Sequence, residues 1–142
     1  MTRRREFRPG DVIPYPYLWK RQREQGETEG RKTRPVCVVI ALASSKDALT
    51  HLALLAISSS PPSDRGNAVV IPEMECRRAG LKDWKAAWIY VDEYNYDIAE
   101  ISFYLDARAE PLGRFSKPFM MRLAAEFIPV FNKRQGRVDR TD

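Results

Sequence analysis

Arg34 is the residue of this sequence best suited to chemistry on a phosphate. It stands where a polar, charged segment, Leu18 to Thr33, meets an apolar run that begins at Val36. The strand that follows should hold its backbone firmly, and its guanidinium offers a planar fork of donors that matches phosphate oxygens. The alternative is a surface ion pair with Glu27 or Glu29.

Several nearby residue types could complete such a site. Ser58 ends an apolar segment, and its hydroxyl could hydrogen-bond a phosphate, although it also suits the Ser-Pro turn that follows. Arg31 and Lys32 suit phosphate binding better than proton transfer. His51 is the only histidine, and a single histidine without a second acid–base group is better explained as structural or exposed.

Aromatic residues beside the charged segment offer surfaces on which bases could stack. Tyr15, Tyr17 and Trp19 alternate along the chain and would share one face of a strand. Single-stranded RNA is bound by such mixtures of cations and rings, yet a place in the core is the commoner role for these residues. A second set of the same kind comes later in the chain: Tyr94, Asn95 and Tyr96.

The net charge of +5 comes entirely from the N-terminal quarter of the chain. Residues 1–35 hold ten Lys and Arg against five Asp and Glu, whereas the remaining 107 residues balance, fourteen against fourteen. A local excess of cations suggests a polyanion as partner, because phosphate contacts dominate affinity for nucleic acids. The alternative is a solvated basic loop that only aids solubility.

The composition predicts a single cytoplasmic domain over residues 1–142, with basic tails at 1–9 and 132–142. A 44% hydrophobic share can close one core in 142 residues. No apolar window predicts a membrane-spanning helix, and no apolar stretch follows the basic start as in a secretory signal. Cys37, Cys76 and His51 give no metal-ligand pattern, so we expect no metal and no cofactor. A reduced chain is a simpler explanation than a disulfide.

Six segments are predicted to be strands: 11–17, 36–42, 50–58, 68–71, 87–91 and 101–105. Pro14 and Pro16 should place the first at an edge or make it irregular, because proline cannot donate to a ladder. Leu18 to Thr33 and residues 59–67 are predicted to be loops. Residues 73–80 suit a helical turn that ends at glycine.

A C-terminal helix is predicted to begin after Ser116, which suits the N-cap position. Phe119, Leu123 and Phe127 recur every four residues and give one apolar face that would pack on the sheet. Pro129 is expected to end or kink this helix, after which 132–142 would fray. Short strands followed by one helix predict a mainly β, α+β fold: a small barrel or strongly bent sheet with a helix against it.

Several short segments follow one another in a recognisable order: Gly10-Asp11-Val12-Ile13, the stretch from Lys32-Thr33-Arg34-Pro35 to Val39, Leu55 to Ser59, Ala87 to Glu93, and Leu112 to Ser116. Together, between residue 8 and about 131, they resemble toxins of the PemK/MazF family. The resemblance implies an SH3-like, CcdB-like small barrel with its C-terminal helix packed on the sheet. It also implies the toxin of a type II toxin–antitoxin pair: a homodimeric, metal-independent endoribonuclease that cuts single-stranded RNA and is neutralised by a small antitoxin.

The same resemblance assigns roles to individual residues. Arg34 would stabilise the charge that builds on the phosphoryl oxygens as the ribose 2′-OH attacks. Glu29, five residues before it, would be the general base, with Glu27 as the alternative. Ser58 stands where the family often has threonine and would contact the scissile phosphate.

Asp92 and Tyr90 mark a departure from the family. Asp92 matches a catalytic aspartate found in an Arg-x-Asp arrangement, but Tyr90 here replaces the arginine and offers only a hydrogen bond or a stacking surface to RNA. Two alternatives therefore stay open. One is a CcdB-like toxin that binds a protein target through C-terminal residues, and the other is a family member that binds RNA or a partner without turnover.

Overall fold

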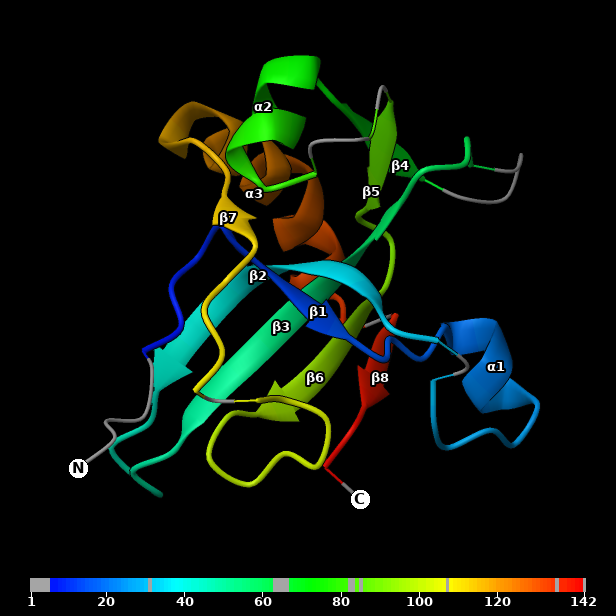
Figure 1. The fold of residues 1–142 in the computed structure, drawn as a ribbon. Helices are drawn as coiled ribbons and strands as arrows, with labels where there is room; N and C mark the ends of the chain where they lie inside the picture. The colour runs from blue at the N-terminus through cyan, green and yellow to red at the C-terminus, as the bar shows by residue number, and fades with distance from the viewer. Residues whose placement is uncertain are drawn as a thin grey trace.

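The computed structural model describes residues 6–30, 32–62, 67–81, 84, 86–106, 108–134 and 136–141. Its strands form a curled antiparallel sheet like half a barrel, with a helix near the C-terminus (Figure 1). The mainly β fold class is thus confirmed. In chain order the elements are β1 (Asp11–Tyr15), α1 (Lys20–Glu24), β2 (Arg34–Ala43), β3 (Thr50–Ser58), β4 (Ala68–Ile71), α2 (Glu73–Arg78), β5 (Ala87–Tyr90), β6 (Tyr94–Ile98), β7 (Gly113–Arg114), α3 (Lys117–Asn132) and β8 (Arg137–Asp139).

The curl of the sheet arises at β3, which has different neighbours at its two ends. The order is β4-β5-β3-β2-β1-β7, while β6 also pairs with β3 and carries β8 on its far side. β6 pairs with the first half of β3, from His51 to Leu54, whereas β5 pairs with its last two residues, Ile57 and Ser58. A register shift between Val38 and Ile40 interrupts the β2–β3 ladder, and such irregularities increase local twist.

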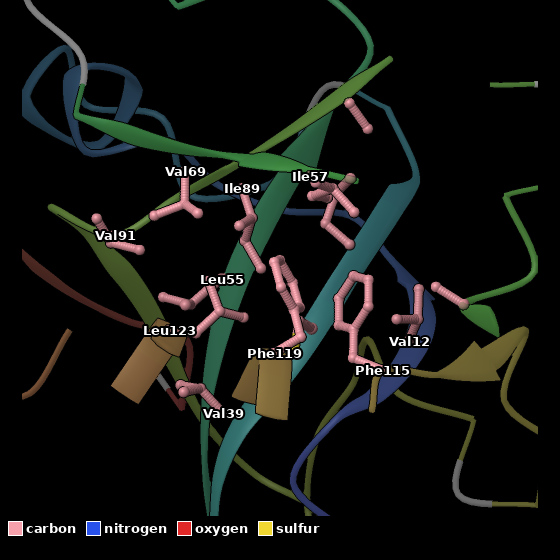
Figure 2. Packing of buried hydrophobic residues seen from close by; sticks show 14 of the residues in the cluster. Val12, Val39, Leu55, Ile57, Val69, Ile89, Val91, Phe115, Phe119 and Leu123 are labelled. Carbon is pink, nitrogen blue, oxygen red and sulfur yellow. The ribbon is translucent and has the colours of Figure 1, made fainter. Parts of the chain in front are cut away.

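The sheet separates two cores, which explains the almost unbroken apolar runs of β2 and β3. One face of β3 contributes Leu55 and Ile57 to a core under α3. Figure 2 shows Phe119 and Leu123 pointing into this core toward β3 and β5. The other face contributes Leu52, Leu54 and Ala56 to a second core. Both faces of these strands are therefore buried, and apolar residues do not need to alternate with polar ones.

α3 begins as predicted but does not end at its proline. The Ser116 hydroxyl accepts a hydrogen bond from the Phe119 N–H at 3.3 Å, and Phe119, Leu123 and Phe127 are buried. Pro129 lies inside the helix, which continues to Asn132. Pro129 and Ala125, whose carbonyl loses its partner, are both on the exposed side. Water can therefore satisfy the freed group, so the helix tolerates the proline.

The strand predicted at 101–105 does not form, and the strand that closes the core is β6. Residues 99–105 are turns and bends, with Phe103 89% exposed. β6 escaped prediction because polar residues fill its buried positions. The Asn95 amide bonds the backbone of Leu18 at 2.9 and 2.7 Å, and Asp97 accepts a hydrogen bond from the Tyr15 hydroxyl at 2.8 Å.

The C-terminal segment, predicted to fray, is instead built into the sheet. β8 runs parallel to β6, and Arg140 directly after it is only 2% exposed. Its Nη1 donates to the Pro16 carbonyl at 2.8 Å and to Asn95 Oδ1 at 3.0 Å. The segment is thus anchored in part by a buried charged residue, Arg140. Because a charged residue does not signal burial in a sequence, the pattern indicated an exposed tail.

The remaining predictions have simpler outcomes. The first strand ends at Tyr15, and the segment predicted as a loop, Leu18 to Thr33, holds the short helix α1. Cys37 and Cys76 are buried, free thiols. His51 bonds Asp47 at 2.9 Å and the Tyr96 hydroxyl, a structural arrangement at the sheet surface. None of the described helices has the length and apolar character needed to cross a membrane.

Candidate nucleic-acid interface

Arg34 opens β2 and lies in a row of residues that crosses four strands. It pairs with Tyr15 on β1, and the β2–β3 register, in which Val36 pairs with Ala56, continues to place it opposite Ser58. Ser58 in turn pairs with Trp88 on β5. Paired residues of antiparallel strands project from the same face of a sheet. Arg34, Ser58 and Trp88 therefore share one face at one end of the sheet.

The Arg34 side chain is held by an aromatic ring and not by a carboxylate. Its guanidinium carbon lies 5.1 Å from the centre of the Trp19 ring, and Arg21 lies over the same ring at the same distance. No described carboxylate forms an ion pair with Arg34, so the pairing with Glu27 or Glu29 considered above does not occur. Its Nε is buried without a hydrogen-bond partner. Burial, and next the nearby Arg21, lower the pKa of Arg34.

Two hollows meet at Arg34. We call the first the Trp19 hollow; its volume is about 300 Å³ and it is lined by Tyr17, Trp19, Arg21, Gln22, Lys32 and Arg34. We call the second the Ser58 hollow; its volume is about 280 Å³ and its lining includes Lys32, Arg34, Pro35, Ser58, Ser60 and Trp84. Lys32 and Arg34 line both hollows and so stand between them. The structure thus brings Lys32, Arg34 and Ser58 together.

Ser58 stabilises the turn that follows β3 and also lies beside Arg34, so the structure is compatible with both roles considered for it. Its Oγ accepts a hydrogen bond from the Ser60 N–H at 3.1 Å and donates to the Ser60 carbonyl at 3.2 Å, which stabilises the turn after β3. It is half-buried and also lines the Ser58 hollow beside Arg34. A weak local bond of this kind is easily exchanged for one to a ligand.

The three aromatic residues expected to stack on bases are all buried. Tyr15 is fully buried, its hydroxyl bonds Asp97, and it lines neither hollow. Tyr17 is 1% exposed, forms part of the Trp19 hollow and donates to Glu93 at 3.1 Å. Trp19 is 7% exposed, and its ring forms a wall of the hollow beside the two guanidinium groups. Of the second set, Tyr94 and Asn95 are buried and only Tyr96 is half-buried.

The two carboxylates expected to act in catalysis line neither hollow and form no ion pair with Arg34. Glu29 is exposed and lines neither hollow. Asp92 follows β5; its Oδ2 accepts from the Asn67 N–H at 3.3 Å, and its Oδ1 is buried without a partner. The neighbouring Tyr90 is half-buried and meets the Trp19 ring edge-on at 5.1 Å. Arg31 lies outside the described residues.

Arg21 and Gln22 line the Trp19 hollow and Trp88 pairs with Ser58, but none of the three was among the predicted site residues. Arg21 and Gln22 lie on α1, which returns the charged segment to the start of β2. No pattern in the sequence of this segment predicts that α1 lies beside the start of β2. Trp88 does carry a signal, since it alternates with Tyr90 on the half-buried face of β5.

Comparison of the chain with protein-family models, with curated proteins and with solved structures finds no match in any of the three. The function has to be inferred from the interface itself, because a fold alone does not fix an activity.

Proposed function

We propose that this protein is a metal-independent endoribonuclease toxin of the PemK/MazF kind that cleaves single-stranded RNA. The observation that carries the proposal is the state of Arg34. Its guanidinium is half-buried, rests over Trp19 and has no carboxylate partner among the described residues. A cation in this state is prepared to bind an anion, because desolvation strengthens its interaction with a phosphate.

The chemistry requires one attack and one departure at phosphorus. The ribose 2′-oxygen forms a bond to phosphorus while the bond to the 5′-oxygen breaks, which leaves a 2′,3′-cyclic phosphate and a 5′-hydroxyl that takes up a proton. Negative charge increases on the non-bridging oxygens during the step, and a fixed guanidinium stabilises that charge. Ser58 lies opposite Arg34 on the neighbouring strand β3, and its hydroxyl can donate a hydrogen bond to the same phosphate.

The two hollows suit a single-stranded RNA that passes Arg34. Unpaired nucleotides can turn their bases into cavities of this kind, whereas bases in a duplex cannot. With the scissile phosphate at Arg34, one neighbouring nucleotide would enter the Trp19 hollow and the other the Ser58 hollow. Lys32, which lines both, would hold an adjacent phosphate.

A cleavage assay with matched arginine variants tests the proposal. Purified protein is incubated with single-stranded RNA of mixed sequence in EDTA, and the product ends are identified. We expect cyclic-phosphate and 5′-hydroxyl ends, and a loss of about 100-fold or more in rate for Arg34→Ala. Arg122→Ala removes an exposed arginine from α3 and should leave the rate unchanged. Intact RNA with the wild-type protein would contradict the proposal.

A second candidate function is RNA binding without turnover. It is favoured by one observation: among the described residues, no carboxylate and no histidine lines either hollow, so the general base is not identified. Tight binding of RNA that stays intact would select this candidate. The CcdB-like alternative gains no comparable support, because Val138 and Arg140 near the C-terminus are buried.

The homodimer, the antitoxin and the cytoplasmic location stay predictions from the family resemblance. A small acidic antitoxin segment would suit the same cationic hollows as RNA. We therefore propose that such an antitoxin competes with RNA for Arg34 and Lys32, in a protein that acts on cytoplasmic transcripts.

A further inference from the structure

Gln22 is a buried amide with a fixed orientation beside the Trp19 hollow. The residue is 6% exposed, and its Oε1 accepts a hydrogen bond from the Trp19 backbone N–H at 3.1 Å. A backbone N–H can only donate, so the amide oxygen must be the atom that faces it. The Nε2 group makes no hydrogen bond with the described residues and remains for the hollow that Gln22 lines.

Every polar side-chain group that the described residues leave free in this hollow is a donor. Arg21, Lys32 and Arg34 are cations with no acceptor atom, and Gln22 presents its NH₂ group. The Tyr17 hydroxyl donates to Glu93 at 3.1 Å, and because Tyr17 is only 1% exposed its oxygen is not open to a ligand. The side chains of the hollow thus combine an aromatic wall with donors alone, and a ligand that they bind must offer acceptors.

We propose that the Trp19 hollow is a base-selection subsite that prefers guanine and uracil to adenine and cytosine. The inference rests on the proposed function in one respect, because the selected base belongs to a nucleotide beside the phosphate held by Arg34. Guanine and uracil carry carbonyl oxygens that accept from Gln22 and Arg21. Adenine and cytosine carry amino groups at the corresponding positions, which would set donor against donor and leave buried groups unpaired.

The cations alone would not produce this selection. Arg21, Lys32 and Arg34 can bind the phosphates of any RNA, since phosphate contacts carry no sequence information. The fixed Gln22 amide is what distinguishes a carbonyl edge from an amino edge. Base preference, and not affinity, is therefore the property that has to be measured.

The first measurement uses RNA that cannot be cut. Short 2′-O-methyl cytidine oligonucleotides carry one variable central base and a fluorescent label, and binding is followed by anisotropy in EDTA. The wild-type protein should bind the oligonucleotides with guanine or uracil about tenfold more tightly than those with adenine or cytosine, as expected for one base-edge contact.

Gln22→Glu gives the decisive comparison. The carboxylate keeps an acceptor for the Trp19 N–H and replaces the NH₂ group with a second acceptor. The preference should then reverse, with adenine and cytosine favoured over guanine and uracil. Gln25→Glu adds the same charge at the exposed C-cap of α1, outside the hollow, and should weaken all four complexes equally without changing their order.

The outcomes separate this inference from the proposed function. Equal affinity for all four bases in the wild-type protein overturns the subsite, while cleavage that depends on Arg34 would still support the nuclease. The predicted preference together with intact unmodified RNA supports the subsite and overturns the nuclease. No binding to any oligonucleotide overturns both. The wild-type preference decides the matter even if Gln22→Glu fails to fold.

Discussion

Three arginines of this chain show how differently a guanidinium can be accommodated. Arg114 pairs with the buried Asp11 at 2.7 Å, and Arg140 donates to two oxygens in the interior. Arg34 has neither an ion pair nor a hydrogen bond among the described residues, only the face of Trp19. Because an uncompensated, partly desolvated charge costs stability, its retention is best explained by a ligand that supplies the missing anion.

Ser58 gives the clearest prediction at the scale of single residues. Ser58→Ala removes a hydroxyl that lines the Ser58 hollow beside Arg34. If that hydroxyl bonds the charged phosphate in the transition state, the cleavage rate should fall by about 10- to 100-fold, the value of a hydrogen bond to a charged group. Single-turnover kinetics on saturating RNA measure the effect.

A serine at the other end of β3 provides the control for this prediction. Ser45→Ala changes an exposed residue of the turn between β2 and β3, outside both hollows, and should cleave at the wild-type rate. Both variants should unfold within about 1 kcal/mol of the wild-type protein, because Ser58→Ala loses only two weak, exposed hydrogen bonds to Ser60 and Ser45 is a surface residue. Equal rates for the two variants would remove Ser58 from the chemistry.

Residue types at strand ends were sufficient to select three candidate residues that the structure places together. Arg34, Lys32 and Ser58 come together because each lies at or beside the end of a strand whose apolar pattern is strong. Glu29 and Gln22 lie in the charged segment, where no pattern predicts which side chain turns inward. Gln22 faces the site through a hydrogen bond to Trp19, a tertiary detail that the sequence does not display.

At the scale of elements, the polar strands were the ones that could not be predicted. β2, β3, β4 and β5 follow from apolar, β-branched runs. β6 and the segment at β8 bury Asn95 and Arg140, which are hydrogen-bonded to each other, and Asp97, which bonds Tyr15, so their sequences resemble a loop and a tail. Asp97 is fully buried, and this burial raises the pKa of its carboxyl.

This network yields a prediction about the stability of the C-terminal strand. Arg140→Ala would remove the donor to Pro16 and Asn95 and the contact of the guanidinium with the Tyr104 ring at 4.0 Å. It would also leave Asp97 without a cation that favours its charged form. We expect a loss of about 3 kcal/mol in the free energy of unfolding, as when one member of a buried polar pair is removed. Urea denaturation measures it.

Arg137→Ala is the matched control, three positions earlier on the same segment. Arg137 is exposed, with its guanidinium over Tyr96 at 3.9 Å and a loose pair with Asp139 at 3.6 Å. Its removal should cost no more than about 1 kcal/mol. Similar losses for the two variants would mean that Arg140 contributes surface contacts only, and that β8 is not held by the buried network.

At the scale of the whole molecule, the fold concentrates charge that the sequence had only placed in one quarter of the chain. α1 lies at the side of the molecule near β8, at a distance from α2 and α3 (Figure 1). From this position it brings Arg21 beside Lys32, which precedes β2, and Arg34, which opens it. Residues 18–35 hold six Lys and Arg against three Glu, so a polyanion should be drawn to this side.

The concentration of cations predicts how RNA binding responds to salt. If Arg21, Lys32 and Arg34 each neutralise one phosphate, the logarithm of the binding constant should fall with the logarithm of salt concentration with a slope of about −2, from about −0.7 per contact on single strands. Arg21→Ala should reduce the magnitude of this slope by about 0.7, because one contact is lost.

Arg122→Ala is the control: it lowers the net charge equally, but it acts on the exposed side of α3 and should leave the slope unchanged. Anisotropy titrations of uncleavable RNA at several salt concentrations provide the slopes. An equal reduction by both variants would indicate that the net charge of the molecule governs binding. The hollows beside Arg34 would then not be a specific site for phosphate.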